Sequence, residues 1–182
     1  MTLRNTLERY GSPQIALHWA MLLLLAAVYA CIELRGIFPR GSEMREAMKS
    51  WHFMLGLSVF VLATVRLMVN FLGPSPRIHP MPSRWQTIAG KAVHLALYVF
   101  MFGMPVVGWL LLGAEAKTIP FFGFELPPLL AADADLAKRL ENVHETVGTL
   151  GYILIAIHAA AALAHHYFFR DDTLRRMLPR RL

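Results

Sequence analysis

Four long apolar stretches dominate this chain and leave few folds open to it. They cover residues 14–32, 50–72, 92–112 and 143–169. A helix of about 20 apolar residues crosses the roughly 30 Å hydrocarbon core of a bilayer. Over the whole chain 16% of residues are charged, well below the roughly 25% of soluble domains. We therefore predict an all-α bundle of four transmembrane helices, formed by residues 1–182 as a single domain in the lipid bilayer.

Composition also excludes several classes of site and partner. The single cysteine, Cys31, lies in the first apolar stretch, which excludes a disulfide framework and a cysteine-based zinc or iron–sulfur site. The net charge of +6 would suit a nucleic acid. In so apolar a chain, however, basic segments more often reflect membrane topology and anionic lipid. We predict no nucleic-acid partner.

The distribution of lysine and arginine predicts the orientation in the membrane. The N-terminal segment, the second connection with its flanks and the tail carry eleven: Arg4, Arg9, Arg66, Arg77, Arg84, Lys91, Arg170, Arg175, Arg176, Arg180 and Arg181. The first and third connections carry seven: Arg35, Arg40, Arg45, Lys49, Lys117, Lys138 and Arg139. Because positive charge is enriched in cytoplasmic loops, we expect both termini to be cytoplasmic.

Histidines inside the apolar stretches are the strongest indication of chemistry. His18, His52, His144 and His158 lie in the first, second and fourth predicted helices. Ionisable residues within a membrane are costly and usually face the bundle interior with a partner. Two neutral imidazoles from different helices can saturate haem iron. Depth along the helices pairs His18 with His158 on the cytoplasmic side, and His52 with His144 on the opposite side.

Helical periodicity and small residues favour the same interpretation. His144 and His158 are separated by nearly four turns, so both project from one face of their helix, about 21 Å apart along its axis. That spacing suits two stacked macrocycles. Small residues that would give a macrocycle room follow these histidines and His52: Gly56, Gly148, Gly151, Ala161 and Ala162. Taken alone, such residues equally indicate a helix–helix contact.

The remaining histidines and one arginine allow several roles. His94, at the cytoplasmic start of the third helix, could cap the helix, reach the interface or contact a quinone. His165 could donate to a quinone carbonyl or a haem propionate, or could be an ordinary interfacial residue. Arg66 either extends to the interface or pairs with the propionates of the cytoplasmic-side haem. We assign no role to His166.

Several runs of sequence resemble bacterial cytochrome b561. They are QIALHW at 14–19, LRGIFPR at 34–40, HETVGTLGY at 144–152 and HAAAALAHHYF at 158–168. The resemblance implies two b haems in a four-helix bundle of the bacterial inner membrane, with the histidine pairs already inferred from depth. It also implies that His165 lies near a quinone. A stand-alone member of this family is a superoxide oxidase, which passes electrons from periplasmic superoxide to ubiquinone.

The resemblance thus implies a superoxide:ubiquinone oxidoreductase. The protein's part at the oxidising end would be to attract a small anion, for which Arg35 and Arg40 are the candidates. A first alternative is a cytochrome b subunit that passes electrons between a dehydrogenase or hydrogenase partner and quinone; the short chain requires no partner but does not exclude one. A second alternative is a transporter or scaffold that uses histidines for metal or helix contacts.

Overall fold

The computed structural model describes residues 4–178 and consists mainly of four long helices. These are α1 (Ser12–Leu34), α2 (Glu43–Phe71), α3 (Arg84–Ala114) and α4 (Ala134–Tyr167). All four are long and apolar enough to cross a membrane, which confirms the four predicted spans. At most 17% of the most apolar window of any helix is buried within the protein. The outer apolar side chains are therefore available to lipid.

Three of the helices begin well before their apolar stretches. α2, α3 and α4 start seven, eight and nine residues ahead of the predicted positions 50, 92 and 143. Each begins at a polar N-cap whose side chain accepts a backbone N–H two or three residues into the helix, the caps being Ser42, Ser83 and Asp133. Such caps satisfy free N–H groups at a helix start. These helices extend beyond the apolar stretches because capping, not hydropathy, determines where they begin.

The first helix also starts differently from the sequence-based expectation. Ser12 is its first residue and Gly11 is the N-cap, with no side-chain capping bond. Pro13 lies in the first turn, where its missing N–H removes no helical hydrogen bond. α3 continues through Pro105 without a break in the helix.

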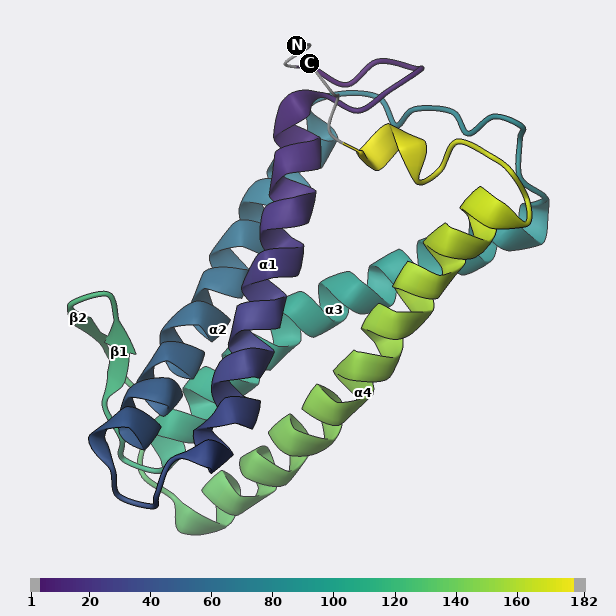
Figure 1. The fold of residues 1–182 in the computed structure, drawn as a ribbon. Helices are drawn as coiled ribbons and strands as arrows, with labels where there is room; N and C mark the ends of the chain where they lie inside the picture. The colour runs from purple at the N-terminus through teal and green to yellow at the C-terminus, as the bar shows by residue number, and fades with distance from the viewer. Residues whose placement is uncertain (1–3, 179–182) are drawn as a thin grey trace.

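The helices pack in sequence order. α1 packs on α2, α2 on α3 and α3 on α4, whereas α4 diverges from α1 toward one end of the molecule (Figure 1). A small buried core joins the first three helices through Met21, Val59, Ala63 and Met101. A second cluster joins α2, α3 and the segment that follows α3 through Leu57, Leu112 and Ile119. The helices therefore form two packed pairs, α1 with α2 and α3 with α4, and the contact of α2 with α3 joins the pairs.

A β-hairpin departs from the predicted all-α fold. β1 (Ile119–Phe121) pairs antiparallel with β2 (Phe124–Leu126). Phe122 and Gly123 between them have φ values of 46° and 90°, the left-handed conformation of tight hairpin turns. Ile119 is only 1% exposed. The hairpin lies at the end of the bundle away from the N-terminal segment (Figure 1).

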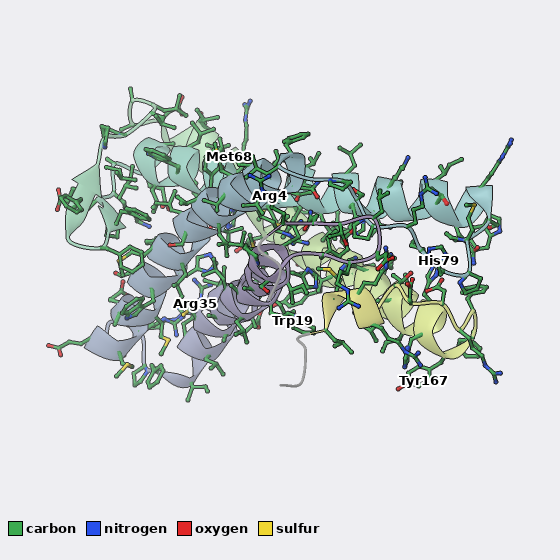
Figure 2. All side chains as sticks on the ribbon, turned by 90° about the horizontal axis from the view of Figure 1, so that it is seen from above. Arg4, Trp19, Arg35, Met68, His79 and Tyr167 are labelled. Carbon is green, nitrogen blue, oxygen red and sulfur yellow. The ribbon has the colours of Figure 1, made fainter. Side chains whose placement is uncertain are left out.

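The chain after α4 folds back over the other end of the bundle. Residues 168–178, which we call the C-terminal strap, contain a short 3-10 helix, η2 (Arg175–Met177). The indole Nε1 of Trp19 donates to the Met177 carbonyl at 2.7 Å, and the strap lies beside Trp19 in the view from this end (Figure 2). Arg180 and Arg181, part of the predicted cytoplasmic charge, lie outside the described residues.

Candidate functional site

Two pairs of histidines face each other at different levels between α4 and the first two helices. The ring centres of His52 and His144 are 6.1 Å apart with an interplanar angle of 80°. Those of His18 and His158 are also 6.1 Å apart, at 62°. The structure thus brings together both pairs that depth predicted. His144 and His158 belong to α4. Their partners belong to α2 and α1, whereas α4 packs mainly on α3.

The ring separation suits two imidazoles that share one metal ion. A metal–imidazole nitrogen bond is about 2 Å long, and the ring centre lies about 1 Å beyond that nitrogen, so two rings in trans have centres about 6 Å apart. Within residues 4–178, no group of three or more histidine, cysteine or acidic side chains could hold a metal ion. A metal held by protein ligands alone usually needs three or four, whereas haem iron needs only two axial ligands. Two-imidazole pairings therefore favour haem over a metal held by protein ligands alone.

His52 has the hydrogen bond expected of a metal ligand. Its Nδ1 lies 3.0 Å from the carbonyl oxygen of Val28, and since a carbonyl only accepts, Nδ1 carries the proton. The other nitrogen, Nε2, is then free of a proton and able to bind iron. The Nδ1 atom of its partner His144 is buried without a hydrogen-bond partner in the described part of the chain.

A cavity of about 670 Å³ surrounds this pair, within the roughly 300–1,000 Å³ range of cofactor-sized pockets. Gly56, Gly108 and Gly148 contribute to its lining. A Cβ atom added at Gly56 would meet nothing within 4 Å, so this glycine leaves the space that was predicted beside His52. A Cβ atom at Gly108 would lie 3.3 Å from Cε1 of His144. The residues present therefore suit a macrocycle at this level.

Gly151 has a different role from the one suggested by its spacing. A Cβ atom there would overlap the Tyr29 hydroxyl and the Phe100 ring. The Tyr29 hydroxyl donates to the Gly148 carbonyl at 2.7 Å, and its ring centre lies 4.2 Å from that of Tyr152, with the two rings tilted by 37°. These tyrosines bridge α1 and α4. Sequence analysis missed them because nothing in their spacing distinguishes them from lipid-facing aromatics.

The other level of the bundle contains a third histidine. The ring centre of His94 lies 5.2 Å from that of His158, closer than the separation of two rings in trans on one metal. His94 belongs to α3, which packs directly on α4 and leaves little width for a macrocycle between them. We therefore retain His18 as the partner of His158.

Arg66 points into the bundle rather than toward the interface. Its Nη2 donates to Nδ1 of His18 at 2.9 Å, and its Nε is buried without a partner in the described residues. A neutral imidazole that accepts at Nδ1 carries its proton on Nε2. Iron binding at Nε2 of His18 therefore requires the guanidinium to leave Nδ1. Propionates at this level would provide an anionic partner for it.

The lining of the cavity contains charged residues of both signs. The basic ones are Arg35, Lys49 and Lys117, and the acidic ones are Glu33, Glu115, Glu141 and Glu145. The Tyr152 hydroxyl donates to Glu33 at 2.8 Å. Arg40 is exposed and is not among the lining residues. Of the two arginines named as candidates for attracting an anion, only Arg35 thus lies in the cavity lining. Arg35 is the C-cap of α1, whereas Trp19 lies in the N-terminal half of that helix.

Comparison with known proteins identifies the family. The model of prokaryotic cytochrome b561 matches residues 9–180. The chain belongs to the prokaryotic cytochrome b561 family. It is 40% identical over 175 residues to "Cytochrome b561 homolog 1" of Escherichia coli K12, covering 96% of this chain and 99% of that protein. It is 34% identical over 174 residues to "Probable superoxide oxidase CybB" of Yersinia pestis, covering 96% and 98%. "Cytochrome b561 homolog 2" of E. coli K12 is 31% identical over 189 residues, covering 98% and 95%.

Membership makes this chain a multi-pass membrane cytochrome with an electron-transfer function, and the family binds haem b. A further polar contact of this cytochrome b561 lies just beyond α4. Nδ1 of His165 contacts the carboxylate of Asp171, which is 5% exposed. Sequence analysis missed Asp171 because it lies after the last apolar stretch, where an acidic residue normally indicates a solvated helix end.

Proposed function

We propose that this cytochrome b561 binds two b haems and carries electrons from periplasmic superoxide to ubiquinone in the bacterial inner membrane. The observation that carries the proposal is the presence of two histidine pairs, each 6.1 Å between ring centres, at two levels joined by α4. His18 and His158 would hold one haem, and His52 and His144 the other. The relative named a probable superoxide oxidase supports the choice of donor.

Placement of the ligands supports transfer across the bilayer. When bound, the haems would supply one-electron carriers at both levels. His144 and His158 project from one face of α4, about 21 Å apart along the axis. The protein's own contribution is to hold the four imidazoles and to keep the surrounding space apolar. The tyrosine pair between α1 and α4 maintains the width of that space.

The oxidising end needs attraction of a small anion but no acid or base, because superoxide is already a reductant. Arg35 is half-buried in the cavity lining, and a positive charge at a low-dielectric opening raises the local concentration of anions. The acidic residues of the lining oppose this attraction, but Glu33 accepts from Tyr152, Glu115 pairs with Lys117 and Glu141 with Lys138. Attraction of the anion must therefore be local to Arg35. Arg35 is thus better situated than Arg40 for this role.

The reducing end takes up protons together with electrons. Ubiquinone becomes ubiquinol by gaining two electrons and two protons, and a group that can release a proton near the cytoplasmic surface is therefore required. His165 lies in the last turn of α4, close to the strap. We assign the quinone to this end of the bundle.

Stopped-flow spectroscopy on the purified protein tests the proposal. Mixing with superoxide should reduce the haems, and an added ubiquinone analogue should then oxidise them again. Absence of a b-type α band in the reduced-minus-oxidised spectrum would rule out haem altogether. Two haems that react with quinone but not with superoxide would instead indicate an electron-transfer subunit that receives its electrons from a protein partner.

A further inference from the structure

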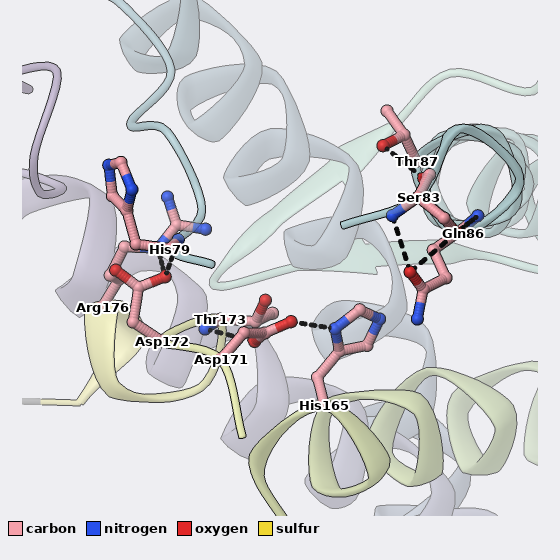
Figure 3. A network of polar contacts seen from close by, with 9 residues as sticks. All are labelled: His79, Ser83, Gln86, Thr87, His165, Asp171, Asp172, Thr173 and Arg176. Carbon is pink, nitrogen blue, oxygen red and sulfur yellow. Dashed lines mark hydrogen bonds and ion pairs between the residues drawn. The ribbon is translucent and has the colours of Figure 1, made fainter. Parts of the chain in front are cut away.

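The contact between His165 and Asp171 depends on a reversal of the chain after α4. Arg170 has a φ of 53°, the left-handed conformation that often ends a helix. The reversal lets the Asp171 N–H donate to the His165 carbonyl at 3.1 Å. It also directs the Asp171 side chain back onto the imidazole, where one carboxylate oxygen contacts Nδ1 and the other accepts the Thr173 N–H at 2.9 Å (Figure 3).

The strap that carries Asp171 is fixed by bonds that do not involve His165. Asp172 accepts the His79 N–H at 2.9 Å and pairs with Arg176 at 3.3 Å (Figure 3). Arg176 also donates to the Pro76 carbonyl at 2.6 Å. These bonds attach the strap to the proline-rich connection between α2 and α3. Asp171 is therefore held in place by its neighbours, and its carboxylate remains available to the imidazole.

Among residues 4–178, no lysine or arginine pairs with the buried carboxylate of Asp171. Within the described residues, its only ion-pair partner is His165, whereas Asp172 has Arg176. Burial opposes ionisation of the Asp171 carboxyl, but hydrogen bonds from His165 and Thr173 outweigh it and lower its pKa. A carboxylate at Nδ1 of a histidine holds the proton on that nitrogen, so that Nε2 becomes the atom that exchanges a proton.

We propose that Asp171 is a positioning residue for quinone reduction, which fixes His165 so that its Nε2 delivers a proton to a carbonyl oxygen of the bound quinone. The proposal rests on the function proposed above. Two superoxide ions each release one electron and leave as O2, and the two electrons reduce one quinone. One proton passes from Nε2 of the His165 imidazolium to a quinone oxygen. The neutral imidazole keeps its Nδ1 proton toward Asp171 and regains the other from cytoplasmic water, which also supplies the second proton of the quinol.

Reoxidation of the pre-reduced protein isolates this step from the superoxide reaction. Protein reduced anaerobically with dithionite is mixed with a water-soluble ubiquinone analogue, and haem oxidation is followed at several quinone concentrations. Asp171→Asn should slow the rate at saturating quinone by about tenfold or more, the usual effect of losing a residue that orients a functional histidine. Asp171→Glu, which keeps the carboxylate, should recover part of the rate. Asp135→Asn, an exposed residue in the first turn of α4 and away from the strap, is the matched control and should stay within about twofold of wild type.

A double-variant comparison separates positioning from a general structural role. If Asp171 acts through His165, adding Asp171→Asn to His165→Gln should change the rate by less than about twofold. Additive effects, or equal slowing by the control variant Asp135→Asn, would overturn the proposal. Haem content and reduction by superoxide at the opposite end should be unchanged in each variant. One combined result would also count against the proposal: Asp171→Asn loses haem, while Asp171→Glu and His165→Gln keep full activity.

A spectroscopic readout does not depend on turnover. In protein labelled with 15N-histidine, the Nδ1 proton of His165 should give a strongly downfield resonance that disappears in Asp171→Asn and persists in Asp135→Asn. Persistence of that resonance in Asp171→Asn would contradict the proposed pairing. If quinone fails to oxidise wild-type protein, the proposed function is wrong and the positioning role falls with it. If wild type reacts and Asp171→Asn reacts equally fast, only the positioning role is wrong.

Discussion

Replacing Gly108 by alanine tests whether His144 is a haem ligand whose position depends on close packing. A Cβ atom at Gly108 would lie 3.3 Å from Cε1 and 3.7 Å from Nδ1 of His144. The first distance is tighter than an ordinary van der Waals contact, so the imidazole has to move by a few tenths of an ångström. Gly103 lies on the same helix, is exposed, and would place an added Cβ atom near nothing within 4 Å. Gly103→Ala is therefore the matched control.

The expected effect is a loss of haem without a loss of fold. Alanine is about 0.5–1 kcal/mol more favourable than glycine inside a helix, and both variants gain that amount. Turning an imidazole about 30° from its rotamer costs about 0.5–1.5 kcal/mol, which offsets the gain at Gly108. The free energy of unfolding of the polypeptide should thus change by about 1 kcal/mol or less in either variant. A shift of a few tenths of an ångström, however, takes up most of the roughly 0.5 Å within which a ligand set has to be held, so haem binding should weaken even though the fold is kept.

Haem stoichiometry and electron paramagnetic resonance measure the outcome. Gly108→Ala should contain less than two haems per chain or show an altered low-spin ferric signal for one of them. Gly103→Ala should retain both haems and both signals, and the thermal unfolding of the two variants should be similar. Two unperturbed haems in Gly108→Ala, or an equal loss in Gly103→Ala, would show that His144 is not a ligand held in this way.

Three further predictions concern other parts of the molecule. His158→Ala should lose one haem and quinone reduction, because the opposing imidazole is left without its trans ligand; two haems per chain in that variant would refute the pairing. Arg35→Gln should slow superoxide-driven haem reduction by about two- to fivefold and flatten the dependence of that rate on salt. Arg40→Gln should have a smaller effect, since Arg40 is outside the cavity. Stopped-flow rates of haem reduction in a salt series measure both effects. The lowered pKa of Asp171 means that its carboxylate stabilises the strap above the unfolded value near pH 4, and that this contribution is lost as pH falls through the lower folded value. The protection of residues 168–178 against hydrogen exchange, corrected for the intrinsic exchange rate at each pH, should fall over that acidic range in wild type. Asp171→Asn should remove this fall in protection.

The apolar cores of the helices could be predicted from the sequence, whereas most of their starts could not. Hydropathy measures what a side chain gains in lipid, and it therefore located the membrane-crossing part of each helix. A helix continues wherever backbone bonding and a cap allow it. Asp133 caps α4 nine residues before the predicted start at 143, and no apolar pattern marks that position.

Pairing of the histidines was accessible because a helix has a fixed rise and rotation per residue. These constants relate His144 to His158 within α4, and antiparallel neighbours supply the partner at each depth. Arg66 and Asp171 were beyond that reasoning. The contact of Arg66 with His18 depends on the direction of a long side chain, and that of Asp171 depends on a chain reversal at Arg170. Neither is encoded by a repeating pattern.

The tyrosine pair explains how α4 can present both histidines without packing directly on α1. Tyr29 donates to the Gly148 carbonyl and packs against the Tyr152 ring, so side chains rather than backbones set the distance between the helices. Small residues at a membrane helix contact normally let backbones approach closely, which would leave no width for a macrocycle between opposing imidazoles. Gly151 instead accommodates Tyr29 and Phe100, whose bulk keeps the helices apart. A glycine near a cofactor pocket can thus make room for the spacer as well as for the cofactor, and only the positions of the tyrosines distinguish the two cases.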